Sequence, residues 1–315
     1  MKILNCYAGI TVLSLFDGMS CGQIALSRLG IKVKKYYAAE IKAHAIRVTK
    51  HNFPDTIHIG DVTKVSYKDG ILYTENGDFE CGNIDLLIGG SPCQDLSAMN
   101  KNQIGLAGSK SSLFWEYNRI RKEILSYNED LQFMLENVGS SPSEDLKIIT
   151  KTLWVDGVRI NSDLVSAQMR DRIYWTNIPG SGVDLFGNKY IQQPIDKGIL
   201  LQDILESGYT TDKKSACLLA RSYNAIPKSH DSMQRYLRKR YAKKFVQIIF
   251  EDDNTVRFFT QKELELLQTV PIGYTDCLSM SEASDVLGDG WTIDVICHIF
   301  NGLDSYNQIK QGVLF

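Results

Sequence analysis

The feature of this sequence that most constrains its fold is a regular alternation of short apolar runs with amphipathic segments. The run Val12–Phe16 closes at Asp17-Gly18, and helical periodicity follows from Gln23 to Leu29. A second pair comes next, with an apolar run over 36–40 and a helical pattern over 43–51. Further strands are expected at 84–88, 131–135 and 172–175, and further helices at about 113–125 and 143–153. This alternation predicts an α/β fold with a doubly wound, mainly parallel sheet. The functional residues are expected at the carboxyl ends of its strands, where such folds bind ligands.

Two interruptions divide this pattern. Residues 65–80 alternate and carry the turn pairs Asp69-Gly70 and Asn76-Gly77, which predict a small β-ribbon attached to the sheet. Around 179–191 glycines and a proline punctuate the chain, and helical periodicity returns from Arg257. We therefore expect a large domain over 1–178, a small domain over 179–256, and a return segment over 257–315 that completes the large domain.

The composition excludes several classes of protein. With 43% hydrophobic and 23% charged residues, the chain is typical of an ordinary soluble protein. Its seven cysteines form no Cys-x-x-Cys pair, which argues against a disulfide framework or a zinc site. It argues instead for a reducing compartment such as the cytoplasm. The cysteine spacing thus gives no reason to expect a metal. No apolar window reaches membrane-spanning length, so a membrane is not expected as a partner either.

The net charge of −2 conceals an uneven distribution. Residues 211–250 carry ten Lys or Arg against two Asp, a local net charge of +8, so the other 275 residues sum to −10. A basic block on an acidic body is typical of a nucleic-acid-binding surface. The candidate contacts in this block are Arg235, Arg238, Arg240, Lys243 and Lys244.

Three groups with catalytic potential follow one another along the chain. Cys93 lies in Gly-Gly-Ser-Pro-Cys-Gln, Glu136 begins Glu-Asn-Val, and Arg170 and Arg172 belong to Gln-Met-Arg-Asp-Arg. A thiolate that adds to carbon 6 of a pyrimidine makes carbon 5 nucleophilic enough to attack a methyl donor. A carboxylic acid at ring nitrogen 3 neutralises the charge that this addition builds. Arginines two residues apart share one face of extended chain and could hold the base. The set predicts covalent chemistry on a pyrimidine ring.

A glycine-bearing turn over 16–22 joins an expected strand to an expected helix, which suits a nucleotide-like ligand. The near-repeat over 3–10 is a weaker candidate, because it runs into another strand with no room for a helix. A dinucleotide fingerprint, Gly-x-Gly-x-x-Gly, is absent, which weighs against a dehydrogenase. Glu40 ends the next strand, where it could accept from ribose hydroxyls. Asp61 could accept from an adenine amino group.

In this order, the motifs resemble those of cytosine-5 DNA methyltransferases over about residues 12–303. The resemblance implies S-adenosylmethionine as methyl donor, double-stranded DNA as substrate, and flipping of the target cytosine out of the duplex. It implies a mobile lid over 95–111 that contains Lys101 and Lys110, a DNA contact by Gln168, and target recognition by the small domain. The implied cofactor contacts are Phe16, Asp17, Gly18, Met19, Glu40, Ile41, Asp61, Val62, Leu113, Gly290 and Trp291.

Two alternative functions fit the sequence less well. A transfer-RNA cytosine methyltransferase would lack an elaborate basic domain, so the +8 block weighs against it. An inactive scaffold relative is expected to have lost Cys93, Glu136 or the Gln-x-Arg-x-Arg motif, and all are present. The form Phe-Asp-Gly-Met-Ser-Cys-Gly is closer to phage-type and vertebrate de novo enzymes than to many restriction-associated ones. We expect a bacterial or phage enzyme, with a cognate restriction endonuclease as a possible partner.

Overall fold

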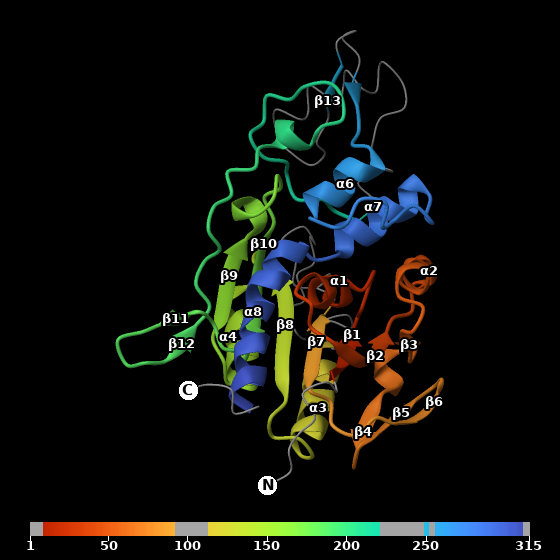
Figure 1. Ribbon diagram of the computed structural model, residues 1–315, viewed down its shortest axis with the longest axis vertical. Helices are drawn as coiled ribbons and strands as arrows, with labels where there is room; N and C mark the ends of the chain where they lie inside the picture. Colours follow the sequence, from red (N-terminus) through yellow and green to blue (C-terminus); the bar gives the residue numbers. More distant parts are fainter. Residues whose placement is uncertain (1–8, 92–112, 221–248, 252–255, 311–315) are drawn as a thin grey trace.

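The computed structural model describes residues 9–91, 113–220, 249–251 and 256–310, with side chains described as far as Leu303. In this part of the chain a seven-stranded sheet has the order β3-β2-β1-β7-β8-β10-β9 (Figure 1). The first five strands are parallel, and β10 is antiparallel to both of its neighbours. The predicted doubly wound, mainly parallel sheet is therefore confirmed. The strands are β1 (Ile10–Leu15), β2 (Val33–Ala39), β3 (Ile57–His58), β7 (Leu86–Gly90), β8 (Gln132–Val138), β9 (Gly157–Asn161) and β10 (Asp171–Thr176).

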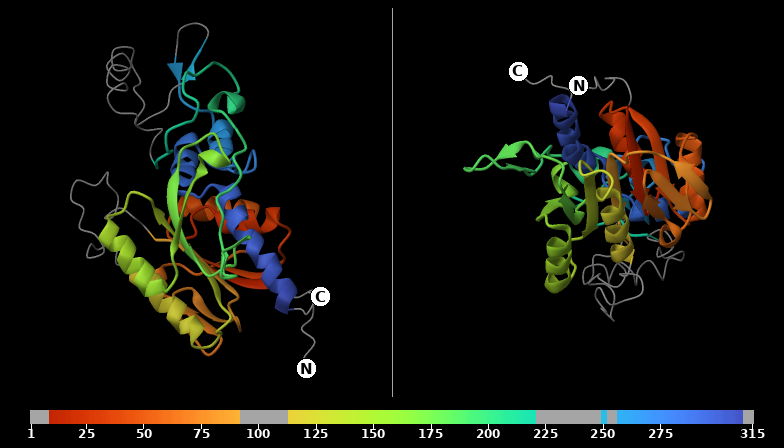
Figure 2. Two further views of the ribbon diagram at one scale, coloured as in Figure 1. Left: turned by 90° about the vertical axis from the view of Figure 1, so that its left-hand side faces the viewer. Right: turned by 90° about the horizontal axis from the view of Figure 1, so that it is seen from below.

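Helices cover both faces of the sheet (Figure 2). One face packs against α1 (Cys21–Arg28), α2 (Ala43–Asn52) and α8 (Ile293–Lys310), and the other against α3 (Leu113–Leu125) and α4 (Ser143–Leu153). Successive strand residues point to opposite faces, so Val12 belongs to the first core and Leu13 to the second. Since both faces are covered, the inner strands β1, β7 and β8 are largely apolar and buried, which is why the sequence predicts them.

The insertion between β3 and β7 forms the expected ribbon. It begins after a short 3₁₀ turn, η1 (Val62–Lys64), and its strands β4 (Ser66–Lys68), β5 (Ile71–Thr74) and β6 (Gly77–Glu80) form an antiparallel three-stranded sheet. Asp69 and Gly70 both adopt positive φ, 50° and 83°, as the predicted two-residue hairpin turn requires. The ribbon lies beside α3, where Glu123 accepts from the backbone N–H of Tyr67 at 2.8 Å.

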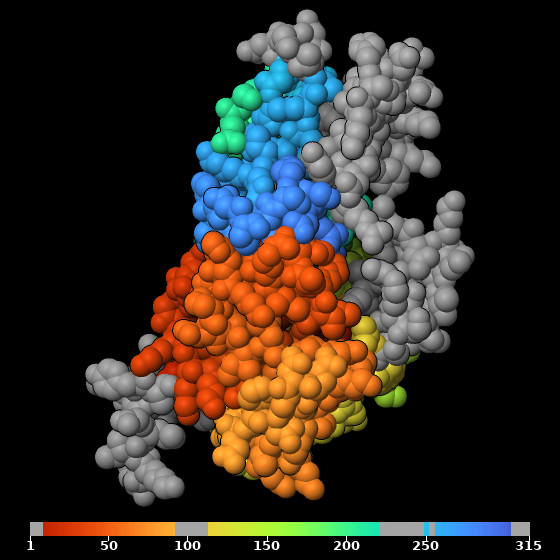
Figure 3. Space-filling model, turned by 90° about the vertical axis from the view of Figure 1, so that its right-hand side faces the viewer, coloured from red at the N-terminus to blue at the C-terminus, as the bar shows by residue number. Residues whose placement is uncertain are grey.

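The chain beyond β10 forms smaller elements before it returns to the sheet. They are β11 (Gly182–Val183), β12 (Lys189–Tyr190), η4 (Leu201–Ile204), β13 (Ile249–Phe250), β14 (Val256–Arg257), α6 (Gln261–Leu267) and α7 (Met280–Asp289). The capping box expected at Thr260 and Glu263 begins α6. Figure 3 shows the blue α6–α7 segment against the red segment that contains α1 and α2, and ion pairs such as Arg47–Glu282 (2.7 Å) join them. The proposed division into domains stays a prediction.

One expectation about the sheet is wrong. We expected every catalytic motif to follow the carboxyl end of a strand, but Arg170 and Arg172 lie at the start of β10. A short connection, which includes the 3₁₀ turn η3 (Ser162–Leu164), joins β9 to β10, so the two strands are antiparallel. Arg172 consequently pairs with Val138 at the end of β8. Reversal of the strand therefore brings the arginines to the edge that carries Glu136.

Candidate active site

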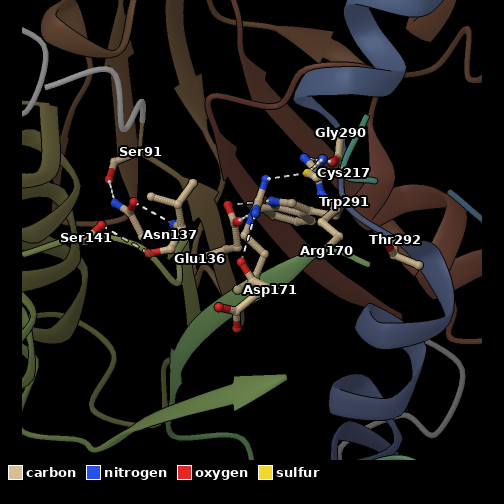
Figure 4. Close-up of polar contacts among 12 residues, drawn as sticks. Ser91, Glu136, Asn137, Ser141, Arg170, Asp171, Cys217, Gly290, Trp291 and Thr292 are labelled. Carbon is tan, nitrogen blue, oxygen red and sulfur yellow. Dashed lines mark hydrogen bonds and ion pairs between the residues drawn. The ribbon is translucent and has the colours of Figure 1, made fainter. Parts of the chain in front are cut away.

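Glu136 is the centre of a buried polar group at the edge where β7 and β8 end. Arg172 Nε forms an ion pair with Glu136 Oε1 at 2.9 Å. The Trp291 indole N–H donates to Oε2 at 3.1 Å, and Figure 4 shows Trp291 beside Glu136. Only 8% of Glu136 is exposed. Both carboxylate oxygens are thus held by donors that come from distant parts of the chain. The structure brings together three of the residues that the sequence predicted.

The backbone of β7 passes directly over this carboxylate. Gly90 pairs with Glu136 in the β7–β8 register, and a Cβ at Gly90 would lie 2.8 Å from Glu136 Oε2 and 3.0 Å from Trp291 Nε1. Only glycine allows so close an approach. Beyond it, Ser91 accepts a hydrogen bond from the Asn137 amide at 3.3 Å. Cys93, two residues later, lies outside the described residues, as do Lys101 and Lys110.

Arg170 points to the backbone and not to open space. Its guanidinium donates to the carbonyl oxygens of Leu218 (3.0 Å), Gly288 (3.0 Å) and Gly290 (2.8 Å), and to Cys217 Sγ at 3.3 Å. The residue is 4% exposed. Arg170 therefore joins the 217–218 segment to the loop before Trp291. These contacts fix the Arg170 side chain in place, and its predicted contact with the substrate stays a prediction.

Gln168 is likewise held by backbone groups. Its side chain is fully buried, its amide N–H donates to the Leu267 carbonyl at 3.2 Å, and its amide oxygen accepts from the Leu218 N–H at 2.6 Å. Both ends of the amide are occupied by backbone groups. Gln168 therefore stabilises the junction between β10 and the smaller elements, and the predicted DNA contact stays a prediction.

The predicted cofactor turn lies at the point where the strand order switches direction, between β1 and β7. Phe16, Gly18 and Ser20 have positive φ, which bends the chain sharply into the N-terminus of α1, while Met19 is fully buried beneath the turn. Doubly wound sheets bind ligands at such switch points. Asp17 accepts from the hydroxyls of Ser20 and Tyr36, and its burial raises its pKa to about 6.

Glu40 connects this turn to α2. Its carboxylate accepts from the backbone N–H groups of Gly18, Ile41 and Lys42, each at 2.8 Å. A Cβ at Gly18 would meet nothing within 4 Å, so open space lies over the turn. Beside it, 72% of the Ile41 side chain is exposed. A carboxylate, free space and an exposed apolar side chain fit a ligand with hydroxyls and an aromatic ring.

The Gly290–Trp291 loop closes the gap between this turn and Glu136. A Cβ at Gly290 would lie 2.8 Å from Met19 Cε, and the Trp291 backbone N–H donates to Cys21 Sγ at 3.2 Å. The loop therefore packs on the cofactor turn while the indole reaches Glu136. This contact makes the predicted cofactor and catalytic residues neighbours.

The remaining predicted cofactor residues lie at the same edge of the sheet or on α3. Asp61 caps η1, where it accepts from the Thr63 N–H at 2.9 Å, and Val62 is buried in the second core. Leu113 begins α3 and packs against that core. Their contact with a cofactor stays a prediction. Arg235, Arg238, Arg240, Lys243 and Lys244 lie outside the described residues.

Two residues that organise the site were not predicted. The Tyr274 hydroxyl donates to the Met19 carbonyl in the cofactor turn at 2.6 Å. Gln268, fully buried, donates to the Leu287 carbonyl at 2.7 Å and accepts from the Thr292 hydroxyl at 2.8 Å, on either side of Trp291. No local sequence pattern predicts these contacts. The Tyr274 hydroxyl, for example, reaches the carbonyl of Met19 across 255 residues of sequence.

The described residues include neither a metal cluster nor a membrane-spanning helix. Among them, no group of three or more His, Cys, Asp or Glu could hold a metal ion. None of the helices in the described ranges is both long and apolar enough to cross a membrane.

The solved structures that resemble this one are methyltransferases. EhMeth of Entamoeba histolytica is 16% identical, with a TM-score of 0.64 and coverage of 94% of this chain and 99% of that one. Dnmt2 of S. pombe is 15% identical, with a TM-score of 0.59 and coverage of 95% and 99%. At this identity the likeness shows the fold.

Sequence comparison goes further. The chain is 40% identical over 118 residues to DNA (cytosine-5)-methyltransferase DRM2 of Arabidopsis thaliana, covering 36% of this chain and 18% of the relative. It is 27% identical over 315 residues to Type II methyltransferase M1.ScrFI of Lactococcus lactis subsp. cremoris, covering 90% and 75%. It is 28% identical over 242 residues to Orphan methyltransferase M.Rho11sI of Bacillus phage rho11s, covering 73% and 43%. The chain thus spans less than half the length of two of these three relatives.

A family model described as C-5 cytosine-specific DNA methylase matches residues 10–217, which is more than half of the chain. The matched range contains the cofactor turn, Glu40, Cys93, Glu136 and the Gln-x-Arg-x-Arg motif. The protein belongs to the C-5 cytosine-specific DNA methylase family.

Proposed function

We propose that this protein is a DNA cytosine-5 methyltransferase that acts on a cytosine flipped out of double-stranded DNA, with Cys93 as the covalent nucleophile. The observation that carries this proposal is the carboxylate of Glu136, held at 2.9 Å by Arg172 and at 3.1 Å by Trp291. It lies beside Gly90, three residues before Cys93 in the sequence. An acid fixed next to a cysteine-bearing segment is what addition to a pyrimidine requires.

In the proposed reaction, the Cys93 thiolate adds to carbon 6 of cytosine. The electron pair of the 5,6 double bond shifts toward carbon 4, and negative charge develops on ring nitrogen 3. Glu136, as the carboxylic acid, shares its proton with ring nitrogen 3 and so neutralises the developing charge. Carbon 5 would then attack the methyl group of a bound sulfonium donor, whose S–CH3 bond would break and whose sulfur would leave as a neutral thioether. Loss of the proton from carbon 5 and expulsion of Cys93 restore the aromatic ring. Arg172 and Trp291 keep the Glu136 carboxyl in one orientation during these steps.

S-Adenosylmethionine is the proposed methyl donor, since its sulfonium makes the methyl group electrophilic. Glu40 and the free space over Gly18 fit its ribose, and the exposed Ile41 side chain fits a stacked adenine. Trp291 would separate this ligand from Glu136. Each of these contacts would bind and orient the donor, and Asp61, Val62 and Leu113 are proposed to complete the pocket.

The basic block over 211–250 is proposed to bind the DNA, and a bacterial or phage-infected cytoplasm is the proposed setting. Similar proteins from a bacterium and a phage are named a type II methyltransferase and an orphan methyltransferase, respectively. We include in the proposal a possible cognate restriction endonuclease, against which methylation would protect the host DNA.

The test is trapping on duplex DNA that contains 5-fluorocytosine, in which hydrogen 5 cannot be eliminated. With S-adenosylmethionine, the wild-type protein should form a denaturation-resistant adduct and Cys93→Ser should form none. Glu136→Gln should slow single-turnover methylation of normal DNA by about 10²-fold or more, because an amide cannot donate the proton. Cys277→Ser and Glu144→Gln are matched controls. An adduct with Cys93→Ser, or no adduct with the wild-type protein, would overturn the covalent mechanism. Methylation confined to transfer RNA would overturn the proposal that DNA is the substrate.

A further inference from the structure

The turn between β5 and β6 of the ribbon lies against the segment that leads from β3 to Asp61. Two side chains of this turn reach the segment. The Asn76 amide donates to the His58 carbonyl at 3.0 Å, and Glu75 Oε1 accepts from the Asp61 backbone N–H at 2.7 Å. The ribbon therefore holds both ends of residues 58–61 through hydrogen bonds to their backbone.

This short segment ends at a predicted cofactor residue. The Ile59 N–H donates to the Ala38 carbonyl at 3.0 Å, so the segment runs beside the end of β2, close to Glu40 in the sequence. Asp61 comes next, and its Oδ1 accepts from the Thr63 N–H at 2.9 Å. The other carboxylate oxygen could accept from the amino group of an adenine. The direction of that oxygen depends on the backbone at Asp61.

The residue before Asp61 is a glycine with a positive φ of 79°. Glycine has more conformational freedom than any other residue, so a contact from outside the segment is needed to fix the Gly60–Asp61 peptide. Glu75 makes this contact, because its carboxylate accepts from the N–H of that peptide. The packing agrees, since a Cβ at Gly60 would lie 2.8 Å from both Cγ and Cδ of Glu75. The Glu75 side chain thus covers the glycine as well as bonding to the residue after it.

We propose that Glu75 is a positioning residue, which fixes the Gly60–Asp61 peptide and so directs the Asp61 carboxylate to the adenine amino group of S-adenosylmethionine. The inference rests on the proposed function, in which Asp61 belongs to the cofactor pocket. It gives the β4–β6 ribbon a part in cofactor recognition. A hydrogen bond near the protein surface corresponds to roughly 3–10-fold in an affinity that depends on it.

Calorimetric titration of the whole protein with two ligands tests this role. S-Adenosylhomocysteine carries the adenine amino group, and an analogue in which hydrogen replaces that group does not. We expect Glu75→Ala to bind S-adenosylhomocysteine roughly 3–10-fold more weakly than the wild type, and to bind the analogue with wild-type affinity. Glu75→Gln keeps an amide oxygen as acceptor and should lose much less. Asp78→Ala, which removes an exposed acid from β6, is the matched control and should bind both ligands like the wild type.

The comparison of the two ligands separates positioning from a general effect on the pocket. In Glu75→Ala, an equal loss of affinity for both ligands, or a loss for neither, would overturn the proposal. A loss in Glu75→Gln as large as in Glu75→Ala would overturn it too. In a double-mutant cycle, Glu75→Ala should cost little once Asp61→Ala has removed the carboxylate, and additive losses would contradict an action through Asp61.

Failure of this proposal can be distinguished from failure of the proposed function. The proposed function fails if the wild-type protein does not methylate DNA. The Glu75 proposal fails if the wild type methylates DNA and binds S-adenosylhomocysteine, while the ratio of its affinities for the two ligands is unchanged in Glu75→Ala.

Discussion

The indole N–H of Trp291 donates to Glu136 Oε2 at 3.1 Å, across 155 residues of sequence. Trp291 follows α7, while Glu136 lies inside the central strand β8. The backbone of Trp291 also bonds to Cys21 at the start of α1. A single residue therefore contacts both the predicted cofactor turn and the predicted catalytic acid. Through it, the order of the cofactor turn and the orientation of the acid depend on each other.

Trp291→Phe should therefore slow catalysis while keeping the aromatic cover over the cofactor turn. The variant keeps the apolar ring but loses the donor to a carboxylate, a hydrogen bond that contributes about 1.5–3 kcal/mol when one partner is charged. We expect kcat to fall by about 10-fold or more, with a smaller rise in the KM for S-adenosylmethionine. Trp154→Phe is the control, because Trp154 is 86% exposed at the end of α4. A lower cofactor affinity with unchanged kcat would contradict the role assigned to the indole.

Glu40→Ala should weaken cofactor binding, because this carboxylate holds three backbone N–H groups that shape the cofactor turn and the start of α2. We expect a loss of about 10-fold or more in affinity for S-adenosylmethionine, since each N–H bond to a charged acceptor contributes about 1.5–3 kcal/mol. Asp61→Ala should lower the affinity less. Calorimetric titration measures both, with Glu144→Ala as an exposed control. Wild-type affinity in both variants would refute the cofactor assignment.

The sequence predicted the elements whose apolar residues follow one clear pattern. The ranges expected for α3 and α4 match the structure, because their apolar residues recur with helical period and face one core. The position of β1 was recognisable because it is buried on both faces. In contrast, β9 was missed, since its five residues alternate only weakly and lie at the edge of the sheet. The direction of β10 depends on that missed strand, which explains the error about where the arginines lie.

Site residues were predictable to the extent that local motifs carry them. Each of Glu136, Arg172 and Trp291 belongs to a motif that marked it as a site residue, and the structure brings the three together. The roles of Arg170 and Gln168 were not predictable, because their partners are backbone groups of residues 218, 267 and 288–290. A sequence motif shows which side chains are present. It does not show which distant carbonyl each donor will reach.

Lys243→Ala and Lys244→Ala should weaken DNA binding on every sequence and flatten its dependence on salt. Each phosphate contact that is lost removes about one released counterion from the slope of log affinity against log salt. Arg238→Ala or Arg240→Ala should instead relax one position of the methylated motif, at a cost of about 1–3 kcal/mol there. Binding across a salt series and methylation of a random-sequence library distinguish the two roles. Lys147→Ala, an exposed lysine on α4, is the control. Unchanged affinity, slope and motif in all four variants would show that the block is a solvated surface.

Asp17→Asn should change the pH dependence of stability, because burial raises the Asp17 pKa from 3.8 to about 6. Between pH 4 and pH 6 the folded protein keeps this proton while the unfolded chain loses it. The folded state then binds more protons, so the free energy of unfolding falls as pH rises through this window. Above about pH 6 the buried charge costs the folded state up to about 3 kcal/mol. The wild-type protein therefore carries this destabilising charge in its cofactor turn, where the Ser20 and Tyr36 hydroxyls donate to the Asp17 carboxylate.

Asparagine cannot ionise, and its amide oxygen still accepts from one of the two hydroxyls. The variant should consequently be slightly less stable than the wild type at pH 4.5, where both side chains are neutral. It should become more stable relative to the wild type as the pH rises to 7.5, by about 1–3 kcal/mol. Urea denaturation at a series of pH values measures this difference, with Glu144→Gln as an exposed control. A stability difference that stays constant from pH 4.5 to 7.5 would mean that Asp17 does not titrate in this range.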